Sequence, residues 1–397
     1  MIQFLPVFVL LPFLGFLVSL IIPKEREVAM SRVAVAVISM QLLSALIYVF
    51  FWLIGDASMI NVKEIVLYKT EGYEFFIDLF FDRVTAVYLL VGAILTLMIT
   101  IYSRYYLHRE TGYKRFFNTI MFFYLGYNII IFSGNLETMF IGWEVLGLSS
   151  FLLIAFYRDR FLPVKNAVKV FSIYRIGDVG MLLAMWLSHH LWHENITFLK
   201  LNNAELVSHH LLEHSAFGVF IAMMFFLSAA VKSAQFPFSS WLPRAMEGPT
   251  PSSAIFYGAV SVHIGVFLMI RTFPFWENQY VVRVLIVLMG LITSFIGFHT
   301  ARVQSSIKAQ IAYSSISQIG IIFIEVALGL EVLALIHFAG NAFLRSYQLL
   351  VSPSVVTYLI REQFYNYVPP KAVAEDSWPK KIKHSIYIMS LKEWNLD

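Results

Sequence analysis

Long apolar runs, each of about 20 residues, dominate the hydrophobic pattern of this chain. An α-helix rises about 1.5 Å per residue, so a run of this length crosses a bilayer core of roughly 30 Å. About eleven such runs can be distinguished, with short polar connections between them. The expected helices cover residues 2–22, 31–54, 82–102, 117–134, 136–157, 166–188, 216–238, 253–272, 280–301, 311–329 and 331–360.

This pattern predicts an all-α polytopic membrane protein. The runs are too long and too uniformly apolar for a membrane β-barrel, so no strands are expected. Because the runs occupy over half of the 397 residues, no room remains for a catalytic domain of ordinary size. The first run has neither a basic leader nor a small-residue cleavage site, and we expect a retained helix rather than a signal peptide.

The composition agrees with a membrane protein and limits its chemistry. Hydrophobic residues make up 59% of the chain and charged residues 14%. The absence of cysteine excludes disulfides, iron–sulfur clusters and thiolate metal sites in this chain, so any redox centre is expected in a partner. His189, His190 and His193 lie at a predicted membrane edge without the carboxylate support of a metal site, and we interpret them as part of a solvated outer loop.

The net charge of +4 reflects the placement of basic residues around the predicted spans. Thirteen lysines and arginines lie in connections after odd-numbered spans and four in connections after even-numbered spans. The positive-inside rule therefore predicts an external N-terminus and a cytoplasmic tail, most simply in a bacterial inner membrane, and gives no reason to expect nucleic acid. The tail, residues 361–397, mixes lysines with apolar residues, which fits either a helix on the membrane surface or a solvated segment.

Five ionisable side chains stand out inside predicted spans, where each costs several kcal/mol unless it has a partner or a function. They are Glu144, Arg175, Asp178, Lys232 and Arg345. Arg175 and Asp178 are three residues apart on one helical face and can largely satisfy each other, as structural ion pairs do. Glu144 and Lys232 have no partner on their own helices, which favours a functional role for both.

A buried lysine beside a carboxylate can load and release a proton. A nearby carboxylate stabilises the charged form of the lysine, so a change in the distance between Glu144 and Lys232 changes the lysine's proton affinity. Arg345 keeps its proton under nearly all conditions, and we expect it to act as a fixed positive charge that tunes its neighbours.

Prolines follow Lys232 closely and predict a broken helix. Pro237, Pro249 and Pro251 lie between two apolar runs, so the helix should end or kink near membrane depth. Broken helices at this depth line cavities or are buried in protein, and ion transporters use their free ends for binding. A simple turn outside the membrane is the alternative.

Further polar residues allow a path to continue from Lys232. Lys308 begins a serine-rich run, and His263, His337 and Asn341 lie in other predicted spans. Each residue alone is weak support, because a polar residue in a helical bundle usually bonds a neighbouring helix. Their combination favours proton conduction, and a membrane anchor with purely structural ion pairs is the competing interpretation.

Six stretches of this sequence closely resemble the antiporter-like membrane subunits. They are FDRVTAVYLL, YSRYYLHRETGYKRFFNTIMFF, NLETMFIGWEVLGLSSFLLIAFY, YRIGDVG, AVKSAQFPFSSWLPRAMEGPTPSSA and IAYSSISQIG. That family includes subunit L (mitochondrial subunit 5) of respiratory complex I, the corresponding membrane subunit of Mrp-type sodium/proton antiporters, and that of DAB-type inorganic-carbon transporters. The resemblance extends from about residue 75 to 350.

The resemblance implies inverted five-helix repeats, each with a broken helix, and a chain of buried ionisable groups that conducts protons. Glu144 matches the family's key glutamate, Lys232 its broken-helix lysine and Lys308 its central lysine. Arg175 and Asp178 match a charged pair at the interface with a neighbouring subunit, and His337 matches a polar position of the next helix. The expected divisions are 1–116, 117–272 as the first repeat, 273–360 as an incomplete second repeat, and the tail.

Departures from the family pattern bear on the assembly. Tyr257 replaces a usual histidine, with His263 six residues later, while Asn341 and Arg345 replace a histidine and a lysine. Together with the incomplete second repeat, they favour a DAB-like subunit whose proton flux drives a zinc-containing cytoplasmic partner. Complex I, with flavin and iron–sulfur centres in partner subunits, and an Mrp-type antiporter are the alternatives, and the ion can be H⁺ or Na⁺.

Overall fold

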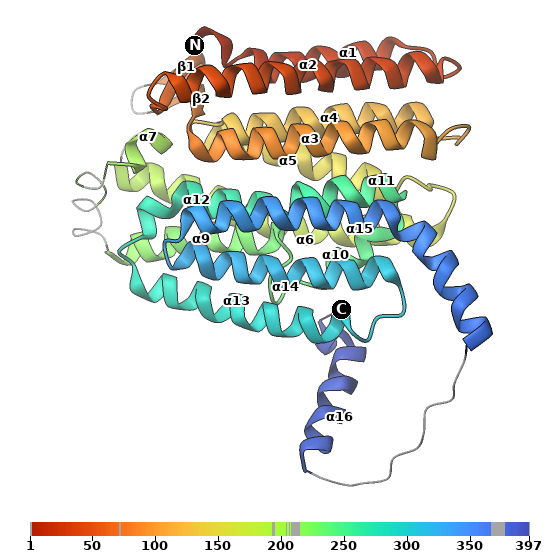
Figure 1. Ribbon diagram of the computed structural model, residues 1–397. Coiled ribbons are helices and arrows are strands. Elements are labelled where there is room, and N and C mark those ends of the chain that lie inside the picture. Colours follow the sequence, from red (N-terminus) through yellow and green to blue (C-terminus); the bar gives the residue numbers. More distant parts are fainter. Residues whose placement is uncertain are drawn as a thin grey trace.

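The computed structural model describes residues 2–70, 73–192, 195–203, 205, 207, 215–366 and 378–396. Its long helices lie side by side in layers, with the first two forming one outer layer (Figure 1). They are α1 (Val7–Ile21), α2 (Glu27–Ile54), α3 (Arg83–Tyr106), α4 (Tyr113–Phe132), α5 (Leu136–Ile154), α6 (Phe161–Trp192), α9 (Ser215–Lys232), α12 (Ile264–Trp276), α13 (Tyr280–Ala301), α14 (Ile307–Ala327) and α15 (Glu331–Asn366).

These helices confirm the predicted polytopic helical fold. Eight helical segments of the described chain are long and apolar enough to cross a bilayer. The shorter apolar helices α1 and α9 occupy two more of the predicted spans, and α15 occupies the position of the last. Each predicted run thus has a helix, although α6 is longer at both ends than the expected 166–188. The division into repeats stays a prediction.

A β-hairpin between α2 and α3 corrects the expectation that the chain has no strands. Strand β1 (Ile60–Thr70) pairs antiparallel with β2 (Tyr73–Phe81), and Ile60 lies opposite Phe81. Both strands lie outside the apolar spans, where β-branched and aromatic residues favour extended structure. Phe80 and Phe81 are fully buried and anchor the hairpin to the bundle.

The helix that carries Lys232 is broken, six residues before the end predicted from the apolar run. Helix α9 ends at Lys232, and the chain continues as the short helices α10 (Trp241–Arg244), η2 (Ala245–Glu247) and α11 (Thr250–Ser253). Ala234 adopts a positive φ of 52°, and Pro237 has no N–H to continue a helix. Pro249 precedes α11 and Pro251 lies in its first turn, where proline is tolerated.

The next predicted span, 253–272, is also irregular rather than one continuous helix. A π-helical segment, η3 (Ala254–Ala259), and a 3₁₀ turn, η4 (Ser261–His263), precede α12. Tyr257 lies in the first and His263 ends the second. Such π segments are frequently found at functional sites.

The tail contains an additional helix outside the bundle. Helix α16 (Trp378–Leu391) and the turn η5 (Glu393–Asn395) lie next to the end of α13, and α16 runs crosswise to the long helices (Figure 1). The short helices α7 (Phe198–Leu201) and η1 (Ile2–Phe4) complete the described elements.

Candidate functional site

Lys232 is a buried lysine at the last position of α9, and its side chain is only about 2% exposed. Its Nζ donates a hydrogen bond of 3.3 Å to the backbone oxygen of Trp143 on α5. The same nitrogen lies 4.7 Å from the ring centroids of both Trp143 and Tyr174. These aromatic faces and the carbonyl replace part of the hydration that the ammonium loses in the protein interior.

Two carboxylates share one arginine beside this lysine. Arg175 on α6 donates to Glu144 on α5 at 2.8 Å, and the same Nη2 lies 2.9 Å from Asp178 one turn further along α6. Asp178 also accepts a hydrogen bond of 2.9 Å from the indole N–H of Trp143. The side chain of Glu144 is 32% exposed and that of Asp178 6%, so the pair reaches from the surface of the bundle into its interior.

The structure therefore gives Glu144 a partner other than the one that the sequence suggested. Glu144 pairs with Arg175, and the ion pairs among the described residues do not join Lys232 directly to a carboxylate. Asp178 and Glu144 are nevertheless the two carboxylates whose charges act on Lys232. Gly147 faces the space between Lys232 and Arg175, and its missing side chain leaves that space open.

The broken helix packs on the same group of residues. The indole N–H of Trp241, on α10, donates 2.9 Å to the oxygen of Val231, the residue before Lys232. Its ring packs edge-on against Tyr174 at 5.0 Å and lies 5.9 Å from Tyr257. Helix α10 thus satisfies a backbone carbonyl near the break and supports the aromatic ring under Lys232.

A second polar group lies where η4 meets α15. Asn341 donates 3.1 Å to Nε2 of His263, and Arg345 donates 3.2 Å to the side-chain oxygen of Asn341. Arg345 also donates to Gln348 at 2.6 Å and to the backbone oxygen of Ser314 at 3.4 Å. His263 is fully buried, so this group forms an interior polar link between α12 and α15.

Several buried hydroxyl groups surround this link without a protein hydrogen-bond partner. They belong to Tyr257, Ser261, Ser315 and Ser346. Buried polar groups of this kind generally bond ordered water. They make the interior around His263 and Arg345 suitable for a hydrated path.

Lys308 lies near the beginning of α14 and caps the broken helix. Its Nζ donates to the backbone oxygens of Met246 and Gly248 at 3.3 and 3.1 Å. Between these two residues, Glu247 accepts a hydrogen bond of 3.3 Å from Asn166 on α6. The structure thus places Lys308 at one end of the bundle, in contact with the segment that follows α10.

His337 lies toward the opposite end of α14. Its Nδ1 is 2.8 Å from Glu325 and its Nε2 is 3.0 Å from Gln318. Sequence reasoning missed Glu325 as a partner, although this carboxylate falls inside the predicted span 311–329. Three polar sites therefore follow one another along α14 and α15, namely Lys308, the group around Arg345, and His337.

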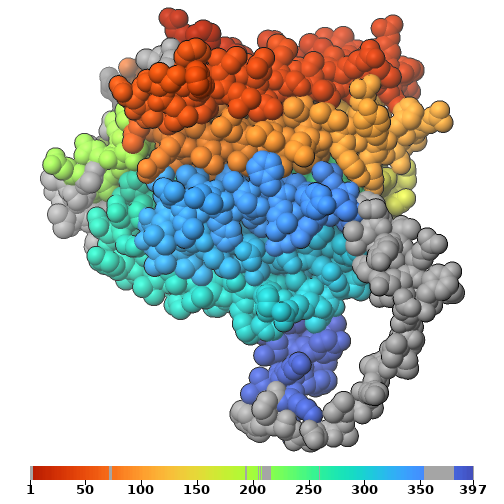
Figure 2. Space-filling view, viewed as in Figure 1, coloured from red at the N-terminus to blue at the C-terminus, as the bar shows by residue number. Residues whose placement is uncertain are grey.

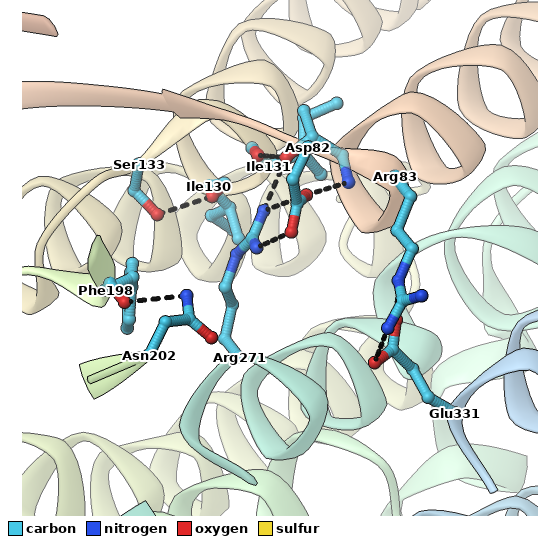
Figure 3. Close-up of polar contacts among 10 residues, drawn as sticks. Asp82, Arg83, Ile130, Ile131, Ser133, Phe198, Asn202, Arg271 and Glu331 are labelled. Atoms are coloured by element: carbon cyan, nitrogen blue, oxygen red, sulfur yellow. Dashed lines mark hydrogen bonds and ion pairs between the residues drawn. The ribbon is translucent and has the colours of Figure 1, made fainter. Parts of the chain in front are cut away.

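A buried ion pair between α3 and α12 was also missed. Arg271 donates to Asp82 with both terminal nitrogens, at 2.6 and 3.0 Å (Figure 3). The Arg271 side chain is only 3% exposed, whereas the sequence interpretation counted this arginine among connection charges. Its position within the predicted span 253–272 was the available signal. Arg83 pairs with Glu331 nearby, at 2.8 Å, beside a cavity of about 490 Å³.

The histidines near residue 190 do not form a site in the described part of the chain. No group of three or more histidines and carboxylates suited to a metal occurs among the described residues. His189 and His190 lie in the last turn of α6, and His193 lies outside the described residues.

A broken helix with a buried lysine, inside a bundle of transmembrane helices, defines a polytopic membrane protein of the antiporter-like class. The chain belongs to the family described as NADH:quinone oxidoreductase/Mrp antiporter, TM, whose sequence model matches residues 133–366. A second model, NADH-Ubiquinone oxidoreductase (complex I), chain 5 N-terminus, matches residues 68–117. The family resemblance inferred from the sequence is thus confirmed.

Curated relatives share about a third of their aligned residues with this chain. The chloroplastic NAD(P)H-quinone oxidoreductase subunit 5 of Lemna minor is 36% identical over 299 residues, which are 74% of this chain and 39% of that protein. The corresponding protein of Poa pratensis is 34% identical over 295 residues, 73% of this chain and 41% of that protein. The chain thus spans about two fifths of the length of these relatives.

Solved structures share the fold. A chain of the Mrp complex from Dietzia sp. DQ12-45-1b superposes with a TM-score of 0.75 at 24% identity, over 86% of this chain and 37% of that chain. A chain of the membrane-bound sulfane sulfur reductase, an archaeal respiratory membrane complex, gives a TM-score of 0.75 at 19% identity, over 88% and 56% of the two chains. At these identities the likeness extends to the fold alone.

Proposed function

We propose that this chain conducts protons across the membrane as one component of a multi-subunit energy-coupling complex. The observation that carries the proposal is Lys232, buried at the end of broken α9 and next to two carboxylates that share Arg175. A lysine at this position can exchange a proton because its charge depends on nearby carboxylates.

The shared arginine provides a coupling step. When Glu144 takes up a proton, its attraction for Arg175 weakens, and the guanidinium is free to pair fully with Asp178. Asp178 then stabilises the positive charge of Lys232 less, and the lysine releases its proton. Loss of the proton from Glu144 reverses these steps. Because Glu144 is partly exposed within a membrane span, where the surface of the bundle faces lipid or another protein, it can exchange protons with a neighbouring subunit.

Beyond Lys232, the proposed route uses the buried hydroxyl groups around Tyr257 and the pair of His263 and Asn341. The imidazole can accept and pass on a proton, whereas Arg345 remains charged and sets the local potential. Lys308 and His337 mark the two ends of the route along α14. We propose protons rather than sodium as the ion, because the buried amine of Lys232 can carry a proton, whereas a metal cation needs several oxygen ligands.

The narrower assignment concerns the assembly. Relatives named as subunit 5 of NAD(P)H-quinone oxidoreductase support a complex whose other subunits carry flavin and iron–sulfur centres. The DAB-type inorganic-carbon system, with a zinc-containing partner, rests only on the departures at Tyr257, Asn341 and Arg345. Analysis of the proteins that co-purify with the chain separates these cases, since a flavin and iron–sulfur assembly excludes the DAB-type proposal.

The orientation is part of the same proposal. The connections rich in lysine and arginine, including the one that contains Arg244 and the tail, face the cytoplasm, and the N-terminus lies outside. A bacterial inner membrane is the compartment that the sequence favours.

Two matched variants on α5 test proton conduction. In the purified, reconstituted complex, Glu144→Gln is expected to reduce proton flux at least tenfold while subunit composition stays unchanged. Glu137→Gln makes the same chemical change two turns earlier on the same helix, away from Lys232, and should retain the flux. If the chain is only a structural anchor, Glu144→Gln instead lowers the yield of assembled complex, and whatever assembles conducts normally.

A further inference from the structure

Helix α16 projects from the bundle and leaves most of its surface uncovered (Figure 2). Only its last turn is held against α13, where Ser390 is buried. The axis of α16 runs crosswise to the axis of α13, near the C-terminal end of α13 (Figure 1). If α13 crosses the bilayer, α16 therefore lies approximately in the membrane plane, close to one surface.

The turn after α16 is fixed by a specific contact. Arg244, at the end of α10, donates to Glu393 with two nitrogens, at 2.7 and 3.3 Å, and Gln304 donates at 3.4 Å. The ring of Trp394 packs edge-on against Phe295 of α13 at 5.9 Å. The Glu393 side chain is only 10% exposed, so the ion pair is largely shielded from solvent.

The backbone of this turn is strained. Glu393, Trp394 and Asn395 have φ values of 49°, 58° and 54°, all in the left-handed region. Such a conformation costs a non-glycine residue roughly 1–2 kcal/mol and persists where surrounding contacts determine it. The attachment to Arg244 is such a contact.

The uncovered part of α16 has two chemically different faces. Ile382, Ile386 and Met389 follow one another at helical spacing, and Ile382 and Met389 are 47% and 37% exposed. Lys380 and His384 lie on the opposite face and are exposed, and Lys383 lies at the border between the two faces. The last turn of α16 adds exposed apolar residues on the side of His384, namely Tyr387, Ile388 and Leu391, so the two faces differ most over residues 380–386.

This arrangement fits a helix at a lipid–water boundary. An in-plane helix with apolar and basic faces buries its apolar side chains among acyl chains and directs its lysines toward anionic headgroups. We propose that α16 binds an anionic lipid surface and that the ion pair between Glu393 and Arg244 attaches this lipid-bound helix to the broken helix.

The ion pair between Glu393 and Arg244 connects lipid binding by α16 to the surroundings of the buried Lys232. Arg244 ends α10, and Trp241 at the start of the same short helix bonds the carbonyl of Val231 beside Lys232. Restraint of α16 at the membrane surface therefore restrains the element that packs next to Lys232. This inference does not depend on which ion the chain conducts.

The absence of cysteine makes a direct test of depth possible, because single cysteines can be introduced and spin-labelled in the full-length chain. The probes are Ile382→Cys and Met389→Cys on the apolar face, and Lys380→Cys and His384→Cys on the polar face. In nanodiscs that contain phosphatidylglycerol, labels at 382 and 389 should collide with oxygen and be protected from a water-soluble nickel chelate. Labels at 380 and 384 should show the reverse.

The comparison samples distinguish lipid from protein as the occupant. In nanodiscs of phosphatidylcholine alone, the difference between the faces should shrink at least threefold. Equal exposure of all four labels to the nickel chelate in anionic nanodiscs would overturn the proposal. Protection of 382 and 389 from both the nickel chelate and oxygen in anionic nanodiscs would also overturn it, since a protein contact excludes both agents whereas acyl chains admit oxygen.

The attachment is tested with a matched pair of variants. Glu393→Ala removes the partner of Arg244, and backbone amides of 241–247 should exchange with deuterium at least severalfold faster. Glu331→Ala breaks the ion pair with Arg83 at the other end of the bundle and should leave exchange at 241–247 unchanged. Unchanged exchange at 241–247 in Glu393→Ala would contradict the attachment of α16 to the broken helix.

Discussion

The open space at Gly147 provides a test in which stability and transport should change in opposite directions. A Cβ at this position would lie 3.6 Å from the Lys232 nitrogen and 3.8 Å from both an Arg175 nitrogen and the Tyr174 ring. These are ordinary van der Waals contacts, so Gly147→Ala should fold without rearrangement. Alanine favours a helix over glycine by about 0.5–1 kcal/mol, and the free energy of unfolding should rise by about that amount.

Proton flux should nevertheless fall. Lys232 makes no direct ion pair with a carboxylate among the described residues, so a proton that passes between Lys232 and Glu144 requires water between them. The added methyl group takes the place of about one water, roughly 30 Å³, at this point. A tenfold loss of flux in the reconstituted complex corresponds to about 1.4 kcal/mol in the barrier, and we expect at least this loss.

Gly142, five residues earlier on α5, is the matched control. A Cβ there would lie 2.7 Å from the backbone oxygen of Gly126 and 2.9 Å from the backbone nitrogen of Ile130. Backbone atoms cannot move aside easily, so Gly142→Ala should destabilise the protein by about 1–3 kcal/mol. Wild-type flux in a stable Gly147→Ala protein would refute a water-mediated route at this position, and destabilisation equal to that of Gly142→Ala would refute the packing argument.

Two further predictions concern the outer elements of the bundle. Asp82→Asn keeps the cap on the backbone N–H of Thr85 but leaves the buried Arg271 without a counter-charge. The free energy of unfolding in mixed micelles should therefore fall by about 3–5 kcal/mol. An unchanged free energy of unfolding would contradict a stabilising role of the pair. Burial raises the pKa of Asp78, in β2 outside the spans, to about 6 from 3.8. The folded state therefore binds this proton more tightly than the unfolded state, and stability decreases as pH rises from about 4 to 6. Relative to wild type, Asp78→Asn should unfold at a higher temperature at pH 7 and at the same temperature below pH 4; an identical pH profile would exclude this contribution.

The membrane helices could be predicted because one physical rule determines them. A bilayer requires about 20 apolar residues per helix, and the runs from 83 to 106 and from 280 to 301 meet that requirement. The hairpin of β1 and β2 was missed because this rule carries no information about segments outside the bilayer. Pro237 predicted a break in the helix after Lys232. The position of the break depends on the local backbone conformation, in which Ala234 has a positive φ.

The partners of the charged residues could not be derived from the sequence alone. Glu144 and Lys232 were identified as unusual because each is a charge inside an apolar run. Which helix supplies their partners depends on how α5, α6 and α9 pack, and the structure shows that Arg175 takes the position beside Glu144. Likewise, Asp82 and Arg271 are 189 residues apart, and only the assembled bundle brings them together.

The most direct test of the central claim replaces Lys232 by a cation that cannot release its proton. Lys232→Arg retains the positive charge and its attraction to Asp178 but holds its proton under nearly all conditions. Proton flux is measured in proteoliposomes that contain the assembled complex, with Lys232→Met as the neutral variant and subunit composition checked for each. We predict that both variants assemble and that both lose at least nine tenths of the wild-type flux. Wild-type flux with Lys232→Arg would show that the lysine provides only a fixed charge, and would contradict its role as a proton carrier.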